Sequence, residues 1–511
     1  MNKAALTNIS GSLWMWFLFM LPMGSCDKKE VNGTGEKRKM NVLLIVSEDN
    51  GPELGCYGNQ EVSTPNIDQL SATGVRFNNA FVTYSVCSPS RSTLFTGLYP
   101  HQNGQIGLAT HHYQMYDSLK TLPHYLHGAG YRAGIIGKRH VNPPGAFQWD
   151  YEAIKGSNFE KVQLDKYAEN ALDFIQRDSV RPYFLMVNFP DAHFPLQKQV
   201  EGLPPDPLNA EDVNGSLPFI GVDSKRLREY TANYYNSMAR LDIAVGWLLK
   251  KLEDKGLLEN TVIIYMGDHG PQFSRAKCSN YEAGLRVPLI IRHPHRYHHV
   301  GVRNELVSSI DIIPTIMDIV GLRIPESLDG MSLLPLLEQQ EPKSKWRDYV
   351  FAGGTGSTSM LFYPRRSVRS DRYKLIQNLL YTRENPKYSF YADHLNGHFA
   401  AGTEELELLG ATDEVRAAYA TWKNPPEYEL YDLQEDPHEF NNIIDKAKYQ
   451  SIKDEMIAAL RKWQIETDDP FYDQGILDRF VEEVDSVNQH FPDHSYAKDP
   501  SFRWNYLQYF K

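Results

Sequence analysis

Four short apolar runs, each followed at once by ionisable residues, place the strongest constraint on how this chain can fold. The runs lie at residues 42–46, 133–136, 183–187 and 261–265. Near-continuous apolar runs of this length are typical of strands that are buried on both faces of a parallel sheet. Amphipathic stretches separate the runs, and one of them places Tyr234, Met238, Leu241, Val245, Leu248 and Leu252 on a single helical face. The sequence therefore predicts an α/β fold, with a mostly parallel central sheet flanked by helices.

The residues that follow these runs predict a polar site at one edge of the sheet. In chain order, the pairs are Glu48 and Asp49, Lys138 and His140, Asp191 and His193, and Asp268 and His269. The carboxyl ends of parallel strands are where open α/β sheets bind ligands. Carboxylates converging there would repel one another unless a cation held them, and Ca²⁺ or Mg²⁺ suits oxygen ligands better than zinc does. Taken singly, each of these acids is more often a helix cap or a solvated loop residue.

After about residue 340 the pattern changes to short segments. Residues 349–351, 369–376 and 429–432 predict antiparallel strands, and Ile452, Met456, Leu460 and Trp463 lie on one face of a predicted helix. We therefore expect a catalytic-type domain over residues 40–340 and a smaller α+β subdomain with an antiparallel sheet over residues 341–511.

The first residues predict a targeting segment. Lys3 precedes the apolar stretch 13–21, which is too short for a lasting membrane anchor and typical of a secretory signal. Gly24, Ser25 and Cys26 resemble a lipoprotein cleavage box with a lipidated Cys26, although Met23 stands where that box usually has Leu. We expect a signal peptide over residues 1–25 and a flexible tether over 26–39. A plain signal peptide is the alternative, and either form predicts export to a bacterial periplasm or outer membrane.

Composition excludes some classes of function. The chain has 511 residues, is 41% hydrophobic and carries a net charge of −11, so it can bury a large core and is unsuited to nucleic acid. Zinc-ligand spacing is absent from the sequence. Besides Cys26 and Cys87 there are Cys56 and Cys278, which we expect to be packing or loop residues rather than a disulfide.

The most specific local string runs from Cys87 to Gly97, with the sequence Cys-Ser-Pro-Ser-Arg-Ser-Thr-Leu-Phe-Thr-Gly. Pro89 is well placed to start a helix and Gly97 to end it, so Cys87 should precede a helix N-terminus, whose free N–H groups favour anions. Arg91, one turn in, offers a planar fork that matches a tetrahedral oxyanion. The string thus predicts a reactive thiol at an anion site, or alternatively a buried cysteine in a capping turn.

This string resembles the sulfatase signature, Cys-x-Pro-Ser-Arg followed by Leu and Thr-Gly. Residues 64–68 (Thr-Pro-Asn-Ile-Asp), 430–433 (Leu-Tyr-Asp-Leu) and 436–439 (Asp-Pro-His-Glu) are also sulfatase-like. The resemblance implies an alkaline-phosphatase-like fold, and oxidation of Cys87 to formylglycine by a dedicated maturase. Segments 101–104, 134–141, 366–369, 378–379 and 462–470 are similar to the sulfamidase (heparan N-sulfatase) branch.

The resemblance implies a role for each matching residue. It places Glu48, Asp49, Asp268 and His269 at metal positions, Arg91, Lys138 and Lys277 at sulfate-binding positions, and His140 and His193 at the catalytic histidine positions. Hydrated formylglycine would attack sulfur beside Ca²⁺, or less favourably Mg²⁺, with His193 as general acid and His140 as base. The family usually has Asp at the position of Glu48, and Asn or His at that of His269, so Glu48 either shifts the ion or lies outside its ligands.

The implied substrate is a sulfated glycosaminoglycan fragment, with the N-sulfate of glucosamine in heparan sulfate or heparin as the first expectation. Its sugar pocket would include His111, His112, Arg366 and Arg369 through the same likeness, and a homodimer stays open. The alternatives are an O-sulfatase on another sulfated sugar, a phosphoester hydrolase of the same fold, and a catalytically silent glycan-binding protein.

Overall fold

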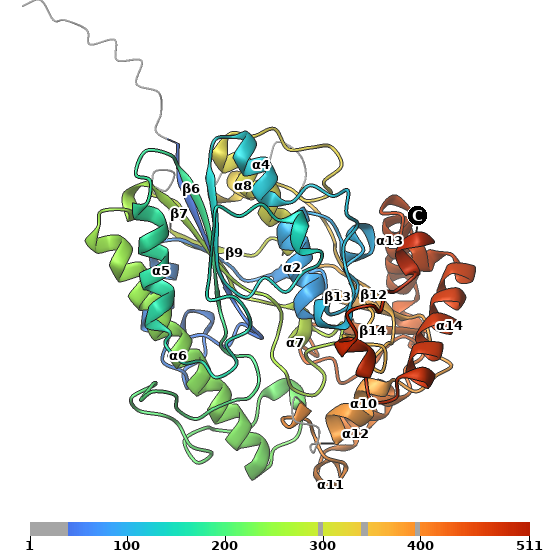
Figure 1. Cartoon of the computed structure of the whole chain (residues 1–511). Helices are drawn as coiled ribbons and strands as arrows, with labels where there is room; N and C mark the ends of the chain where they lie inside the picture. The colour runs from blue at the N-terminus through green and yellow to red at the C-terminus, as the bar shows by residue number, and fades with distance from the viewer. Residues whose placement is uncertain (1–38, 295–299, 339–345, 394–398, 511) are drawn as a thin grey trace, which may run out of the picture. The chain divides into compact units, whose positions relative to one another are not determined.

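The computed structural model describes residues 39–294, 300–338, 346–393 and 399–510, all of which belong to one compact unit (Figure 1). The predicted signal peptide, Cys26 and the tether up to residue 38 lie outside the described residues. None of the helices described is both long and apolar enough to cross a membrane.

The four apolar runs form neighbouring parallel strands, as predicted. They are β1 (Asn41–Ser47), β4 (Arg132–Gly137), β6 (Tyr183–Phe189) and β7 (Thr261–Gly267). Within the described residues the large sheet has the order β5-β4-β6-β1-β7-β8-β2-β9, so these four are adjacent. The remaining strands are β5 (Tyr151–Ala153), which is parallel to β4, β8 (Leu289–Arg292) and β2 (Val75–Phe77), which pair antiparallel, and β9 (Gly301–Arg303).

Helices cover both faces of this sheet, which explains why its central strands are apolar throughout. Leu43 and Ile45 of β1 pack in one core with α1 (Pro65–Ala72), α5 (Asp165–Gln176) and α6 (Lys225–Asp254). Val42 and Leu44 point to the other face and pack with α2 (Cys87–Thr96), α4 (Leu122–Gly128) and α8 (Ile312–Val320). Figure 1 shows the two helical layers on either side of the sheet. The predicted apolar stripe on α6 is buried, as expected for core packing.

A second sheet is antiparallel and follows later in the chain. Its strands are β11 (Val350–Gly354), β12 (Arg365–Arg369), β13 (Tyr373–Asn378) and β14 (Tyr428–Asp432), and α13 (Gln450–Glu466) packs on it through Met456, Leu460 and Trp463. The prediction of one strand over residues 369–376 is wrong. A turn closed by Ser370 N–H donating to the Tyr373 carbonyl (2.9 Å) divides this segment between β12 and β13.

The last residues pack on the catalytic half of the chain. Helix α14 (Gln474–His490) and the segment after it form an aromatic cluster with Ile106 and Tyr113, which lie between α3 and α4. Other short elements are β3 (Ala80–Phe81), β10 (Val307–Ser308), α3 (Pro100–Asn103), α7 (Glu282–Leu285), α9 (Leu334–Leu337), α10 (Pro386–Ala392), α11 (Glu405–Leu408) and α12 (Asp413–Lys423). Residues 39–511 group into a single compact unit. This grouping does not test the predicted domain boundary near residue 340, which stays a prediction.

Candidate active site

A cavity of about 650 Å³ opens where the four parallel strands end. Cys87, Lys138, His140, His193 and Lys277 all line it. The four predicted metal residues are completely buried, and contacts described below join them to the lining residues: Glu48, Asp49, Asp268 and His269. The strand-end pattern therefore does bring these side chains to one place, because β4, β6, β1 and β7 are neighbours.

Cys87 is the first residue of α2, so the helix begins two residues before Pro89, the start that the sequence suggested, and Val86 is the N-cap. Gly97 ends the helix with φ 70°, a left-handed conformation that glycine adopts without strain, as predicted. Every residue of α2 is buried, so the helix fixes the direction of the Cys87 and Arg91 side chains.

The surroundings of Cys87 favour a negative charge. Its Sγ lies 3.2 Å from Nε2 of His269. Burial raises the pKa of the thiol, but the charges of Lys138, Lys277 and His269 outweigh burial, and the pKa is lowered overall. The crevice at position 87 is therefore electropositive enough to hold an anion.

Three cations surround this crevice, and each is held by a carboxylate. The Arg91 Nε donates to Asp268 Oδ2 (3.1 Å), the Lys138 ammonium to Glu48 Oε2 (2.8 Å), and the Lys277 ammonium to both oxygens of Asp49 (2.8 and 2.9 Å). Burial lowers the pKa of the Lys138 ammonium, but Cys87 and Glu48 raise it more, so Lys138 stays charged. For Lys277, Asp49 is the main group that outweighs burial and raises the pKa.

Asn188 is a site residue that the sequence analysis missed. Its Oδ1 accepts a hydrogen bond of 2.6 Å from the Arg91 guanidinium, and its Nδ2 donates to the Ile136 carbonyl. The available signal was a single amide within the otherwise apolar strand β6.

The buried donor atoms fit a divalent cation. Ligand atoms of Asp49, Cys87 and His269 all lie within 4.8 Å of one another. The His269 Nδ1–H donates to the Gly270 carbonyl (2.8 Å), which turns Nε2 toward Asp49 Oδ1 (3.3 Å) and Asp268 Oδ1 (3.8 Å). Burial lowers the pKa of His269, yet Asp268, Cys87 and Asp49 raise it to about 9. A ring nitrogen that binds a proton this strongly, with anionic groups around it, is also suited to binding a metal ion.

Glu48 has two cations as its partners. Neither Glu48 nor Asp268 is in the group formed by Asp49, Cys87 and His269; one oxygen of Glu48 accepts from Lys138 and the other, Oε1, lies 3.5 Å from Arg91. Burial is the main reason that its pKa is raised. These contacts favour the alternative in which Glu48 lies outside the ion's ligands, and the choice between the two alternatives stays a prediction.

The two candidate catalytic histidines have different surroundings. In the described residues neither ring nitrogen of His140 has a hydrogen-bond partner, and burial together with Lys138 and Arg91 holds its pKa well below the ordinary value. His140 is therefore neutral. His193 donates from Nδ1 to the Phe194 carbonyl (2.7 Å) and stacks on Phe159 at 4.5 Å.

Several residues that sequence reasoning considered lie elsewhere. Asp191 forms a buried bidentate pair with Arg240 (2.6 and 3.0 Å). Of the four sugar-pocket candidates, only His111 is among the described residues that line the cavity. His112 contacts the Tyr496 carbonyl instead. Arg366 pairs with Asp469, and Arg369 pairs with Glu282. Cys56 and Cys278 are free thiols, as expected.

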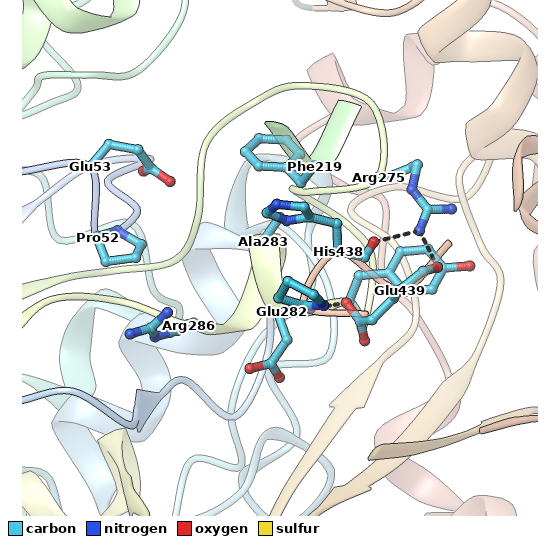
Figure 2. Close-up of a pocket in the computed structure, with 11 residues that line it drawn as sticks. Pro52, Glu53, Phe219, Arg275, Glu282, Ala283, Arg286, His438 and Glu439 are labelled. Carbon is cyan, nitrogen blue, oxygen red and sulfur yellow. Dashed lines mark hydrogen bonds between the residues drawn. The ribbon is translucent and has the colours of Figure 1, made fainter. Parts of the chain in front are cut away.

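A second, smaller cavity of about 130 Å³ shows how the loop carrying Lys277 is anchored (Figure 2). Arg275 donates to the carbonyls of His438 (3.1 Å) and Glu439 (2.6 Å). Glu439 in turn accepts from the backbone N–H of Glu282 (2.6 Å). The sulfatase-like segment 436–439 thus contacts this loop on both sides of Lys277.

Sequence comparison gives the family. The sulfatase family profile matches residues 40–322, and a profile described as N-sulphoglucosamine sulphohydrolase, C-terminal, matches residues 267–400 and 388–466. Human N-sulphoglucosamine sulphohydrolase is 32% identical over 483 residues, covering 86% of this chain and 93% of the human protein. An ulvan-active sulfatase of Formosa agariphila is 30% identical over 434 residues, covering 83% and 80% of the two chains.

Solved structures agree in fold. One, bound to its substrate D-glucosamine-2-N,6-O-disulfate, superposes with a TM-score of 0.63 at 20% identity and covers 84% of this chain and 99% of its own. A phosphonate monoester hydrolase of Agrobacterium radiobacter gives 0.62 at 21% identity, with 84% and 96% covered. The Cys87 signature lies at the strand ends, and the sulfatase profile matches more than half of the sequence. This chain therefore belongs to the sulfatase family.

Proposed function

We propose that this sulfatase removes the N-sulfate of glucosamine from fragments of heparan sulfate or heparin, with formylglycine made from Cys87. The observation that carries this proposal is the match of the C-terminal half to the N-sulphoglucosamine sulphohydrolase profile, together with 32% identity to the human enzyme. The electropositive crevice around Cys87 supports it, because the group to be cleaved is anionic.

The chain's own cations would bind the sulfuryl group. Arg91, Lys138 and Lys277 are buried and charged, so they can stabilise negative charge on the sulfuryl oxygens as it grows in the transition state. Asp49, Asp268 and His269 would hold Ca²⁺, with Glu48 acting through Lys138 and Arg91. When present, the ion and formylglycine would supply a hydroxyl nucleophile that is ionised at neutral pH.

The histidines would divide the proton transfers. An amine leaves readily only after protonation, and His193 is the proposed donor to the departing nitrogen. Its Nδ1 is committed to the Phe194 carbonyl, so the proton would come from Nε2. His140 is the proposed base, and its neutral ring suits that role.

We also propose export, with lipidation of Cys26 and an encounter with a formylglycine-generating maturase. These proposals rest on the sequence of the first residues and of the signature.

Release of free sulfate tests the proposal directly. Wild-type protein coexpressed with a maturase is expected to release sulfate from N-sulfoglucosamine at least tenfold faster than from glucosamine 6-O-sulfate. The Cys87→Ala variant should fold normally and show no turnover, and mass spectrometry of the peptide containing residue 87 should detect formylglycine in the wild type. Near wild-type activity in Cys87→Ala would refute the scheme.

A second candidate is an O-sulfatase. It is favoured by the ulvan-active relative at 30% identity and by an N-acetylglucosamine-6-O-sulfatase of Bacteroides thetaiotaomicron at 23%. A preference for the 6-O-sulfated sugar in the same assay would select this candidate.

A further inference from the structure

The mouth of the active-site cavity is built partly by the C-terminal tail, residues 491–510. Asp493 and His494 of this tail line the same cavity as Cys87. The two matched family segments end at residues 322 and 466, so neither covers the tail. The comparisons therefore assign no role to these two side chains.

The tail is firmly packed. Tyr496 and Tyr506 are completely buried in the aromatic cluster. The Trp504 indole N–H donates to the His111 carbonyl (2.8 Å), and the Tyr506 hydroxyl donates to the Gly104 carbonyl (2.7 Å). The tail that carries Asp493 and His494 is thus anchored before a ligand arrives, which reduces the entropy cost of binding one.

The charges along the cavity are arranged by depth. Lys138 and Lys277 are buried at 3% and 7% exposure, whereas Asp493 is exposed. Asp493 is the single carboxylate among the described residues that line this cavity. A ligand would therefore place an anionic group deep inside and meet a negative charge at the mouth.

His494 adds an imidazole with spare hydrogen-bonding capacity. Its Nδ1 is buried and has no hydrogen-bond partner within the described ranges. The ring meets His111 edge-on at 5.6 Å, with φ 61° at its own backbone. A buried polar atom without a partner is costly, so this nitrogen is suited to a ligand group.

We propose that Asp493 and His494 form a subsite for neutral hydroxyl groups on the sugar that carries the scissile sulfate. A carboxylate can accept hydrogen bonds from two neighbouring hydroxyls, and the imidazole can pair with a third group. A second sulfate at this position would face the Asp493 carboxylate and be rejected. This inference rests on the proposed function and adds that the enzyme prefers a target sugar with free hydroxyls at the mouth.

The test compares a sugar substrate with one that lacks sugar hydroxyls. Asp493→Ala and His494→Asn are assayed on N-sulfoglucosamine and on 4-methylumbelliferyl sulfate, with Asp499→Ala as the matched control. Asp499 is a half-buried acid of the same tail that accepts from Ser501 and does not line the cavity. For Asp493→Ala we expect kcat/KM on the sugar to fall roughly 10- to 100-fold, mostly through KM, with the aryl sulfate rate within twofold of wild type.

Selectivity gives a second readout. The wild-type enzyme should cleave N-sulfoglucosamine with an additional O-sulfate more slowly than N-sulfoglucosamine itself. The Asp493→Asn variant should show a smaller difference in rate between these two substrates. An equal loss on the sugar and the aryl sulfate, or no loss on either, would overturn the subsite. If the proposed function fails instead, wild type will cleave an O-sulfated glucosamine, and the same variants are then compared on that sugar.

Discussion

At the scale of single residues, the charges at the strand ends differ in what they contact. Ligand atoms of Asp49, Cys87 and His269 lie within 4.8 Å of one another. Glu48 instead accepts a hydrogen bond from Lys138 and lies 3.5 Å from Arg91. The two neighbouring acids therefore have separable roles.

We predict that the Asp49→Asn variant loses more of its bound metal than the Glu48→Gln variant does. Asp49→Asn removes a proposed ligand charge, whereas Glu48→Gln acts only through Lys138 and Arg91, so its calcium affinity should change by roughly tenfold or less. Metal content after dialysis, measured by mass spectrometry of the metal, and calcium titration check this. Equal metal loss in both variants would place Glu48 among the ligands.

At the scale of elements, the loop between β7 and α7 depends on a distant segment. Arg275 is completely buried, with its guanidinium 4.4 Å from the Tyr281 ring centre and bonded to the carbonyls of His438 and Glu439. Lys277 lies two residues further along and reaches Asp49. The C-terminal half of the chain therefore helps to anchor the loop that carries this cation.

We predict that Arg275→Gln lowers activity by displacing Lys277. Two buried carbonyls would lose their charged donor, at a cost of about 2–4 kcal/mol in stability. We expect kcat/KM to fall at least tenfold even at temperatures where the variant is fully folded, with stability followed by thermal unfolding. Arg286→Lys is the control, because Arg286 lines the same small cavity (Figure 2) but donates to the Asn78 carbonyl. A fully folded Arg275→Gln variant with wild-type kcat/KM would show that the anchor does not position Lys277.

At the scale of the whole molecule, a buried ion pair joins the second sheet to the segment after α13. Arg366 of β12 forms a bidentate pair with Asp469 (2.5 and 2.6 Å), and both side chains are completely buried. Burial raises the pKa of Asp469, but the Arg366 charge and its hydrogen bonds outweigh burial and lower it to about 2. Arg366, a sugar-pocket candidate by resemblance, is thus a structural residue by its contacts.

We predict that Arg366→Met destabilises the protein by about 3–5 kcal/mol, because Asp469 would be left buried without a counter-charge. The double variant Arg366→Met/Asp469→Leu should recover much of that loss. Urea unfolding at pH 7 measures both. If the single and double variants are equally unstable, the unpaired charge is not the cause.

The pair also predicts a pH dependence. The pKa of Asp469 is lower in the folded protein than the ordinary value near 3.8, so its contribution is complete above about pH 5. The contribution, about 2 kcal/mol, is lost as the pH falls from about 4 through 2. The stability difference between wild type and the double variant should therefore be flat from pH 5 to 8 and shift below pH 4. A difference that stays constant down to pH 3 would contradict the assignment.

The sequence by itself determined the parallel core and most of the site. Strands buried on both faces must be apolar throughout, and the residues that follow them must share one edge, so Asp49, Lys138, His140 and Asp268 could be placed together from the order of the chain. The Cys87 string indicated the family through its resemblance to the sulfatase signature.

Only the tertiary structure decided the rest. Asn188 is hidden in an apolar strand, Arg275 binds carbonyls more than 150 residues away, and Asp493 and His494 reach the cavity through aromatic packing of the tail. None of these contacts has a local sequence pattern. They depend on which distant surfaces pack together, and that is set by the summed burial of side chains across the molecule rather than by any short segment.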